Sequence, residues 1–371
     1  MIGVLGATGS VGSAAVVHLH RLGAGPLRIG ARRRAPLEKL AADVPAETVP
    51  VDVRDPVALA AFTAGCTIVL NCAGPTYELK ETVARAALAA GAHCVDVAGD
   101  DPVREALHGR DLGDRTVLLS AGTLPGLSNL LPRWLAGTEF DRVEALSAWV
   151  GGVEHCSPVV AVDMLLSLQT GGAGGEAYGE ANAAWRAGGP RARALRPAED
   201  VVVPMFPGPV AVQPFLSAET RRLAATLGLT TLDWFNVYPG PAVRALLTAL
   251  PAAAREGADR QQLADRMIRA ATVDLAGRQP YYQMVFTLRG SRAGQASEAR
   301  VVLRTPSSYR LTGLVGALAT VAVHRGAVPP GVHYAAEVLD PAAVVDAVRA
   351  AGEASVRIVS ANGDDEEEGS L

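Results

Sequence analysis

The first 120 residues alternate short apolar runs with alanine-rich segments of helical pattern. The apolar runs predict strands at 2–5, 27–31, 48–51, 67–71, 94–97 and 116–119. The segments between them predict helices at 13–22, 36–42, 56–63, 79–90 and 102–109. Short buried strands separated by helices are typical of a parallel sheet with both faces covered. Residues 1–125 are therefore predicted to form a doubly wound α/β domain.

Beyond residue 140 the pattern changes to longer stretches in which apolar and polar residues alternate. Two such stretches, 281–289 and 299–304, flank a glycine-containing loop, which predicts an antiparallel hairpin. Helical patterns intervene at 158–169, 217–228, 241–254 and 258–273. We therefore expect an α+β domain with a mostly antiparallel sheet over residues 126–309.

Three further segments complete the predicted organisation. Residues 171–200 are rich in Gly, Ala, Arg and Pro, which favours a surface loop. Helical patterns at 310–325 and 341–351 predict that residues 310–360 pack back on the first domain. Residues 361–371 carry five consecutive acidic side chains and are expected to form a disordered, solvated tail.

A glycine-rich turn joins the first predicted strand to the first predicted helix. Gly6, Gly9 and Gly12 follow the apolar run directly, in a G-x-x-G-x-x-G spacing. Such glycines let the chain turn sharply, let backbone amides approach a pyrophosphate and let the helix pack closely on the sheet. The turn thus predicts a Rossmann dinucleotide site formed by Gly6, Ala7, Thr8, Gly9, Ser10, Val11 and Gly12.

The end of the second strand indicates which nicotinamide cofactor is bound. An NAD site usually carries Asp or Glu there, whereas this chain has Arg32, Arg33 and Arg34. A guanidinium pairs with a 2′-phosphate through charge-assisted hydrogen bonds, so NADP(H) is expected, with Arg32 and Arg33 at the phosphate. Arg34 is interpreted as a solvated helix start. Asp52, after the third strand, is a candidate for the adenine end or an ordinary helix-cap residue.

The fourth strand ends in a loop suited to the nicotinamide half of the cofactor. The loop residues are Asn71, Cys72, Ala73, Gly74 and Pro75. A strand end beside the first strand borders the nicotinamide, and Gly74 permits a close backbone approach. Short-chain dehydrogenases have a similar loop but need a Tyr-x-x-x-Lys pair, and no tyrosine occurs between residues 78 and 177. That mechanism is therefore excluded.

Composition restricts the other classes of function. The 371 residues are 49% hydrophobic and 19% charged, with a formal net charge of −4 that the five acidic tail residues account for. Without the tail the protein is nearly neutral, which does not indicate binding to nucleic acid or to an anionic membrane. No apolar run reaches the roughly 20 residues that span a bilayer. Four cysteines without C-x-x-C spacing favour a reduced, cytoplasmic protein without a bound metal.

Three segments resemble the saccharopine dehydrogenase-like reductases. They are NCAGPTYELKETVARAALAAGAHCVDVAGDD at 71–101, SAGTLPGLSN at 120–129 and the stretch Thr312–Leu339. In the second segment Leu124 stands where that family usually carries Asp. The resemblance implies NADP-dependent chemistry at a carbon–nitrogen bond, a small-molecule substrate and an α+β domain that mediates homodimerisation.

Imine reduction needs a group that stabilises a cationic carbon–nitrogen centre. Asp100, after the fifth strand, is the candidate carboxylate, while its neighbour Asp101 is an equally good helix cap. Tyr77 and Lys80 follow the cofactor loop with i,i+3 spacing and are further candidates, although each also has a structural interpretation.

The crossover between the two domains is expected to form the wall of the substrate cleft that lies opposite the nicotinamide, which we call the substrate wall. Its candidate residues are Gly122, Thr123, Pro125, Gly126, Ser128 and Asn129. The pair His155 and Cys156 could suggest a cysteine nucleophile, but a buried inert thiol is the commoner case. Two alternatives to carbon–nitrogen chemistry stay open: reduction of a polarised C=C or C=O bond, and a non-catalytic NADP(H)-responsive binding protein.

Overall fold

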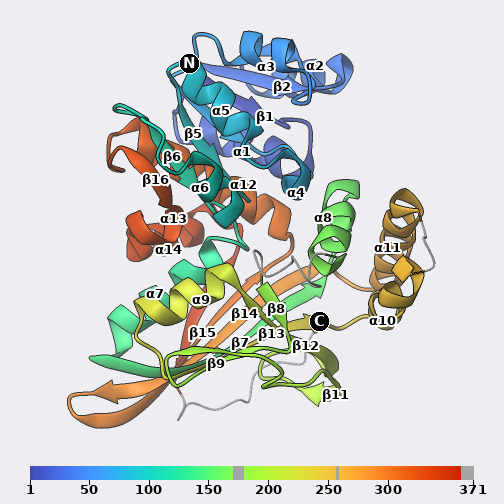
Figure 1. Cartoon of the computed structure of the whole chain (residues 1–371), viewed down its shortest axis with the longest axis vertical. Helices are drawn as coiled ribbons and strands as arrows, with labels where there is room; N and C mark the ends of the chain where they lie inside the picture. The colour runs from blue at the N-terminus through green and yellow to red at the C-terminus, as the bar shows by residue number, and fades with distance from the viewer. Residues whose placement is uncertain (170–178, 256–258, 361–371) are drawn as a thin grey trace. The chain divides into compact units, whose positions relative to one another are not determined.

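The computed structural model describes residues 1–169, 179–255 and 259–360, which form two compact units. The first unit comprises Met1–Leu130 and Ser308–Glu353, and the second comprises Leu131–Ser307 and the residues from Ala354 on. Figure 1 follows the chain through both units by colour. The expected segment 310–360 is therefore divided between the units rather than packed as one piece. The acidic tail lies outside the described residues.

A seven-stranded parallel sheet forms the first unit, which confirms the predicted doubly wound architecture. Its order is β16-β6-β5-β4-β1-β2-β3. The strands are β1 (Ile2–Leu5), β2 (Leu27–Ala31), β3 (Ala46–Pro50), β4 (Ile68–Asn71), β5 (His93–Asp96), β6 (Thr116–Leu119) and β16 (Gly331–Tyr334). Strand β16 was not expected from the sequence; it joins the sheet beside β6 although it lies more than 200 residues later in the chain.

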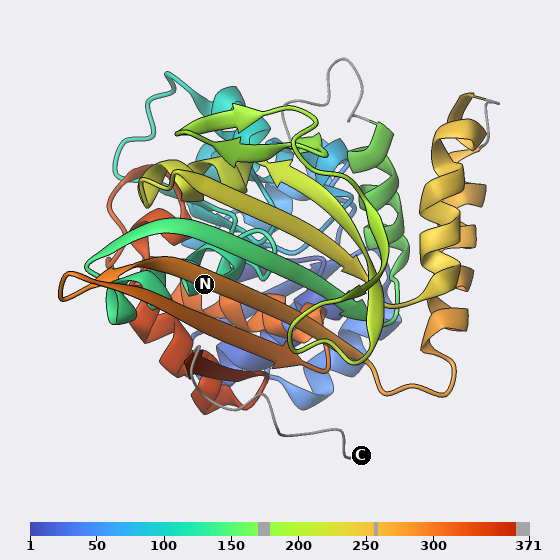
Figure 2. The same ribbon diagram turned by 90° about the horizontal axis from the view of Figure 1, so that it is seen from below.

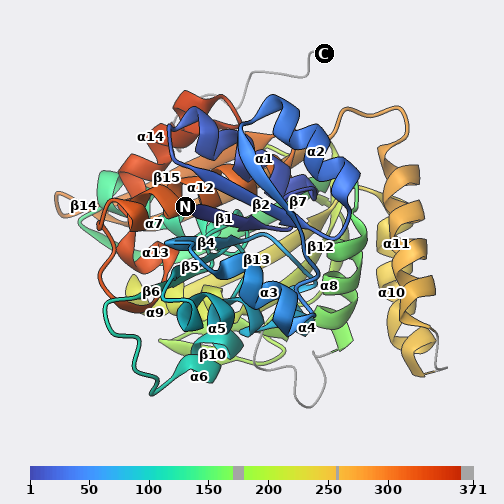
Figure 3. The same ribbon diagram turned by 90° about the horizontal axis from the view of Figure 1, so that it is seen from above.

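Helices cover both faces of this sheet. They are α1 (Ser10–Arg21), α2 (Arg34–Asp43), α3 (Pro56–Thr63), α4 (Thr76–Leu79), α5 (Thr82–Ala89), α6 (Asp101–Leu107), α12 (Ser308–His324), α13 (Ala335–Val338) and α14 (Pro341–Ala351). Figure 3 shows α1 and α12 on one side of the sheet and α3, α5 and α6 on the other. On the latter side Phe62, Val83 and Leu107 are fully buried against the strands, so this face holds a continuous apolar core.

Helix α12 packs unusually close to the first unit's core because two of its residues lack side chains. A Cβ on Gly313 would lie 2.6 Å from the carbonyl oxygen of Val11 and 2.7 Å from the Cβ of Ala14, both on α1. A Cβ on Gly316 would lie 2.8 Å from Val97. The two glycines therefore let α12 rest directly on the helix that follows the glycine-rich turn.

The second unit is built on a ten-stranded sheet, seen from below in Figure 2. Its main path is β10-β9-β13-β7-β14-β15-β17, and β12 adds β11 and β8 beside β13. The strands are β7 (Arg142–Val153), β8 (Gly179–Ala181), β9 (Ala184–Arg186), β10 (Gly189–Arg191), β11 (Ala198–Val202), β12 (Pro209–Ser217), β13 (Thr231–Tyr238), β14 (Tyr281–Arg292), β15 (Gln295–Thr305) and β17 (Ser355–Ser360). Only β7 and β13 pair in parallel within the described sheet, so the expected mostly antiparallel arrangement is confirmed.

Two local expectations for this unit have different outcomes. The hairpin across residues 290–294 is confirmed, since β14 pairs with β15 as far as Arg292 and Gln295. The surface segment expected at 171–200 contains short strands that the composition did not predict, since β8 to β10 and the start of β11 lie within residues 179–200. Trp185 anchors this region, because it is buried and its indole Nε1 donates to the carbonyl oxygen of Leu229 at 2.9 Å. Residues 170–178 lie outside the described part.

The remaining helices are α7 (Leu127–Glu139), α8 (Pro158–Gln169), α9 (Ala218–Thr226), α10 (Pro241–Arg255) and α11 (Arg260–Leu275). The unit boundary falls within α7. Helices α8, α10 and α11 share an apolar cluster that includes Leu165, Leu263 and Met267. The described residues contain no helix of the length and apolarity that crossing a membrane requires.

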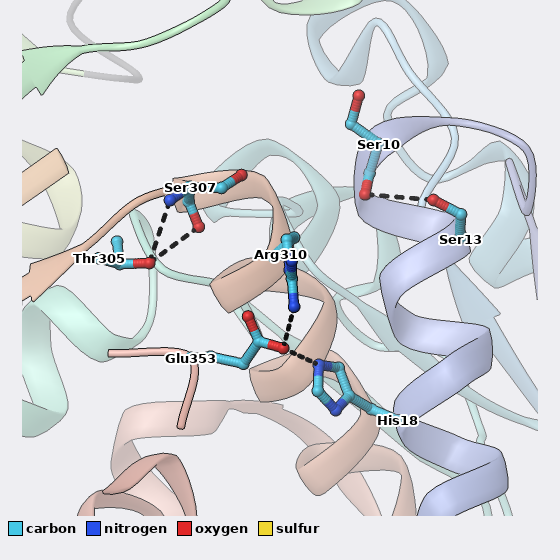
Figure 4. A network of polar contacts seen from close by, with 7 residues as sticks. All are labelled: Ser10, Ser13, His18, Thr305, Ser307, Arg310 and Glu353. Carbon is cyan, nitrogen blue, oxygen red and sulfur yellow. Dashed lines mark hydrogen bonds and ion pairs between the residues drawn. The ribbon is translucent and has the colours of Figure 1, made fainter. Parts of the chain in front are cut away.

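A buried polar cluster in the first unit joins α1, α12 and Glu353, the second residue after α14 (Figure 4). His18 Nε2 lies 3.3 Å from Glu353 Oε1, and the same oxygen accepts from Arg310 Nη2 at 2.8 Å. His18 and Glu353 are both buried, while the Arg310 side chain remains largely exposed. Burial lowers the pKa of His18 despite the neighbouring carboxylate, so the neutral imidazole donates to Glu353 at neutral pH.

This cluster predicts a pH-dependent contribution to stability. The unfolded chain protonates a histidine near pH 6.5, whereas the folded protein resists protonation of His18. Stability should therefore be lost as pH falls from about 6.5 toward the lower folded pKa. Urea unfolding between about pH 7.5 and pH 5 should show a smaller loss for His18→Gln than for the wild type. His20→Gln, an exposed change on the same helix, is the control. A wild-type pH slope in His18→Gln would contradict this assignment.

Candidate functional site

The turn between β1 and α1 is closed by backbone contacts that leave no room for side chains. Gly6 has a φ of +72°, and a Cβ there would lie 2.6 Å from the carbonyl oxygen of Cys72. A Cβ on Gly12 would overlap the carbonyl oxygen of Gly6. The turn therefore lies against the loop after β4, and the first turn of α1 lies against the turn itself. Glycine is required at both positions for steric reasons.

The N-terminus of α1 is suited to a phosphate group. Gly9 occupies the N-cap position without a side-chain hydrogen bond to the helix, and Gly9 and Ser10 are exposed. Helix α1 has twelve residues, so its first amides carry the partial positive charge of a full helix end. This geometry matches the glycine-rich phosphate site that the sequence predicted.

Three arginines follow β2, and two of them are available for an anionic ligand. Arg34 pairs with Glu38 at 3.8 Å, as expected of a solvated helix start. Arg32 and Arg33 are exposed and, within the described residues, have no carboxylate partner. They therefore carry uncompensated positive charge at the strand end where a dinucleotide-binding sheet meets the adenosine ribose.

The structure separates the two roles considered for Asp52. Asp55, rather than Asp52, caps α3, because its Oδ1 accepts from the amides of Val57 and Ala58 at 2.9 and 3.2 Å. Asp52 is exposed, and its Oδ1 accepts a local hydrogen bond from the amide of Arg54 at 3.0 Å. A contact with the adenine end stays a prediction for Asp52.

The loop after β4 is held from beneath by Asn71. The buried Asn71 donates from Nδ2 to Asp96 at 2.8 Å, and its Oδ1 accepts from the amide of Ala73 at 3.1 Å. The amide of Cys72 also donates to the carbonyl oxygen of Leu5 at 3.0 Å. Asn71 thus positions the loop, while the half-buried residues 73–75 form its surface. Burial raises the pKa of the Cys72 thiol, so this cysteine stays protonated.

The three candidate catalytic residues lie in two short segments. Tyr77 is half-buried on α4, whereas Lys80 is exposed and follows the end of that helix with a φ of +45°. Tyr77 and Lys80 therefore do not share one helix face as their i,i+3 spacing suggested, because α4 ends at Leu79. Asp100 occupies the N-cap position of α6 without capping it by its side chain. The cap considered for Asp101 is wrong too, because Asp101 begins α6 and accepts from the hydroxyl of Tyr334.

The crossover after β6 folds back on itself through glycine contacts. Gly126 has a φ of +125°, and a Cβ on Gly122 would lie 2.5 Å from the carbonyl oxygen of Val97. The amide of Leu127 donates to the carbonyl oxygen of Gly122 at 2.9 Å. The crossover is therefore packed directly on the turn after β5, next to the segment that carries Asp100.

The polar residues of the crossover do not share one environment. Thr123 is buried and accepts a hydrogen bond from the Thr312 hydroxyl at 3.0 Å, so it anchors α12 rather than facing a ligand. Ser128 is fully buried and Asn129 is 7% exposed. No protein partner of the Asn129 side chain is found in the described part of the chain, which leaves its amide suited to a ligand. Leu124, at 43% exposure, forms the apolar tip of the crossover.

The cysteine nucleophile is disfavoured by the structure. His155 and Cys156 lie in the connection between β7 and α8. Burial, with the charge of Glu154, raises the pKa of Cys156 to about 11. A thiol with that pKa supplies almost no thiolate at neutral pH.

The sequence did not single out Asp96 as a candidate site residue. Asp96 ends β5 and is almost fully buried, and it accepts the amide hydrogen bonds of Ala98 and Gly99. A buried strand that ends in an acid before a glycine turn was visible in the sequence, but its connection to Asn71 depends on the pairing of β4 with β5.

Comparison with known proteins identifies the domain that this geometry forms. Residues 2–111 match the family model described as the saccharopine dehydrogenase NADP binding domain. Residues 2–111 therefore form a domain similar to the NADP binding domain of saccharopine dehydrogenase. The predicted family resemblance and the predicted cofactor, NADP(H), are thereby confirmed, and the chain is an NADP-dependent oxidoreductase.

A solved structure shares the fold of the whole chain. Apo saccharopine dehydrogenase (L-Glu forming) from Saccharomyces cerevisiae superimposes with a TM-score of 0.67 at 14% sequence identity, over 97% of this chain and 99% of the yeast chain. A probable dehydrogenase from Thermotoga maritima aligns more weakly, with a TM-score of 0.46 at 11% identity over 97% and 98% of the two chains.

The residues present fit NADP(H). The steric exclusion of a Cβ at Gly6 and Gly12 leaves the backbone of the turn accessible to a pyrophosphate, and the exposed Arg32 and Arg33 carry the charge that a 2′-phosphate requires. Asn71 and the half-buried residues 73–75 lie at the end of β4, directly beside β1 in the sheet. That is the position where the strand order reverses and dinucleotides bind.

We predict that Arg32→Asp reverses or abolishes the preference for NADPH over NADH. A hydrogen bond between charged groups contributes roughly 1.5–3 kcal/mol, so the ratio of the two dissociation constants should change by about tenfold or more. Fluorescence titration with each cofactor measures this ratio. Arg34→Asp is the matched control, because Arg34 already pairs with Glu38. An equal effect of both substitutions would show that general charge, rather than Arg32, attracts the phosphate.

Proposed function

We propose that this oxidoreductase acts on a carbon–nitrogen bond, reducing an imine with NADPH or oxidising a secondary amine with NADP⁺. The observation that carries the proposal is the placement of Asp100. Its carboxylate-bearing segment follows β5 at the same sheet edge as the glycine turn and the loop after β4. The name of the yeast protein with the same fold, saccharopine dehydrogenase, supports the same class of chemistry.

Each part of the site has a distinct task in this proposal. The bound cofactor supplies or accepts the hydride. Arg32 and Arg33 hold its 2′-phosphate, and the glycine turn with the α1 N-terminus holds the pyrophosphate. Gly74 and Pro75 border the nicotinamide side. In this division the 2′-phosphate of the cofactor is recognised at one end of the sheet edge, and hydride transfer takes place at the other end.

The half-buried Asp100 stabilises the positive charge of the iminium. A carboxylate beside a cationic nitrogen keeps that nitrogen protonated, so the carbon remains electrophilic. Tyr77, which is half-buried, is the candidate partner for a substrate hydrogen bond. Because Lys80 is exposed, we assign it a weaker, electrostatic role at the rim of the site. The crossover supplies the Asn129 amide and the apolar Leu124, which favours a substrate with one polar and one apolar part.

The homodimer and the cytoplasmic location expected from the sequence stay predictions. Light scattering of the purified chain measures the first, and fractionation of cells that produce it measures the second. Neither result alters the assignment of the cofactor.

The reaction class is tested by NADPH consumption with a panel of substrates. Oxo acids mixed with amines, and preformed cyclic imines, should be reduced, because both present a protonated carbon–nitrogen double bond to Asp100. Asp100→Asn should lower kcat by about 100-fold while NADPH binding is retained, since one charge-stabilising group is removed. Turnover of enones or ketones alone would reject the carbon–nitrogen assignment. No NADPH consumption with any compound of the panel would favour a non-catalytic binding protein.

The substrate wall is tested by Asn129→Ala. We expect a higher KM or a lower kcat, with NADPH affinity within about threefold of the wild type, a change of roughly 0.7 kcal/mol. Thr138→Ala, an exposed change on the same helix, should leave both quantities unchanged. Loss of NADPH binding or of folding in Asn129→Ala would make Asn129 a structural residue of the helix start.

A further inference from the structure

A single buried carboxylate lies between the two loops that border the proposed reaction site. Asp96 ends β5 in the middle of the parallel sheet and is 3% exposed. Its Oδ1 accepts from the amides of Ala98 and Gly99 at 2.9 and 2.8 Å, and its Oδ2 accepts from Asn71 Nδ2 at 2.8 Å. Asp96 therefore satisfies three donors from two segments of the chain.

These hydrogen bonds connect β4 to β5 at their carboxyl ends. Asn71 extends this hydrogen-bond network to the loop after β4, because its Oδ1 accepts from the amide of Ala73. On the other side the turn at Gly99 lies against Asp96, since a Cβ on Gly99 would be 3.0 Å from the Asp96 Cγ. The next residue in the chain is Asp100. One carboxylate thus sets the positions of residues 72–75 and 97–100 together.

The turn at residues 97–100 also supports the crossover. The amide and hydroxyl of Ser120 both donate to the carbonyl oxygen of Gly99, at 2.9 and 3.0 Å. The amide of Ala121 donates to the carbonyl oxygen of Asp96 at 3.0 Å. A shift of the Asp96 turn would therefore also move the start of the proposed substrate wall.

The charge of Asp96 has no cationic partner among the described residues. Burial raises its pKa, and the three donated hydrogen bonds lower it in part. Because every neighbouring polar group is a donor, the ionised form is the one that fits the site. A buried carboxylate without an ion pair is costly to the fold, so its presence is better explained by positioning than by stability.

We propose that Asp96 is a positioning residue for the nicotinamide end of the site: through Asn71 it orients the loop at residues 72–75, and through Ala98 and Gly99 it orients Asp100. The part that concerns Asp100 rests on the proposed function, whereas the part that concerns the cofactor requires only NADP(H) binding. The adenosine end, formed by the glycine turn and Arg32, should be independent of Asp96.

The proposal is tested by a pair of exchanges between Asp96 and Asn71. In Asp96→Asn the new amide nitrogen faces the Asn71 Nδ2, so one hydrogen bond is lost whichever way the amides turn. In the double variant N71D/D96N the new carboxylate at 71 accepts from both Ala73 and the amide at 96, so all four hydrogen bonds can form again. Asp111→Asn is the control, because exposed Asp111 accepts an equivalent turn bond from Gly113 at 2.9 Å.

Dissociation constants are measured for NADPH and for adenosine 2′,5′-bisphosphate, which lacks the nicotinamide. Asp96→Asn should weaken NADPH about tenfold, as expected for one lost hydrogen bond near 1.4 kcal/mol, and leave the fragment within about twofold. The double variant should restore NADPH affinity. Equal weakening of both ligands, unchanged NADPH affinity, or a folded double variant without recovery would overturn the proposal.

A measurement on the wild type covers the case in which a variant does not fold. Hydrogen exchange at the amides of Ala73, Ala98 and Gly99 should slow on binding NADPH but not on binding the fragment. Equal protection by both ligands, or by neither, would overturn the proposal. Because these readouts measure binding, a failed substrate panel would reject the proposed reaction and leave the role of Asp96 intact. A failed binding test would reject Asp96 alone.

Discussion

The cofactor-binding unit depends on one steric constraint, the direct contact of backbone with backbone around the first turn of α1. Gly12 lies on Gly6, Gly6 lies on the loop after β4, and Gly313 of α12 lies on Val11. Each contact would be broken by a single Cβ, because the atoms approached are main-chain atoms that cannot rotate away. The glycines thus fix how closely α1 packs against the turn before it and against α12, and with it the position of the helix end that is suited to a phosphate.

Buried polar groups join the segments that this packing brings together. Asp96 and Asn71 tie β5 to β4, and Glu353 ties α12 to His18 on α1. Both sites use an anion that accepts several hydrogen bonds, and both connect residues far apart in the chain. A partly satisfied buried network costs more than an apolar one, so such groups specify one arrangement of the chain rather than adding much to its stability.

The proposed site has two ends with different structural origins. The adenosine and phosphate end consists of a helix terminus and exposed arginines on one strand–turn–helix segment and its neighbour. The proposed nicotinamide end is assembled from the segments that follow β4, β5 and β6, which are neighbours in the sheet. The first end therefore depends on a short local stretch of the chain, whereas the second depends on loops, which tolerate changes in sequence more readily.

The sequence by itself determined the features that depend on neighbouring residues. The glycine turn, the arginines after β2 and most helices and strands of the first unit follow from local steric and hydrophobic patterns within about 20 residues. The tertiary structure alone decided where β16 joins the sheet, that residues 179–200 form strands, that Lys80 lies beyond α4, and that Asp96 meets Asn71. These features depend on contacts between distant residues or on the exact end of a short helix, and neither leaves a periodic signal in the sequence.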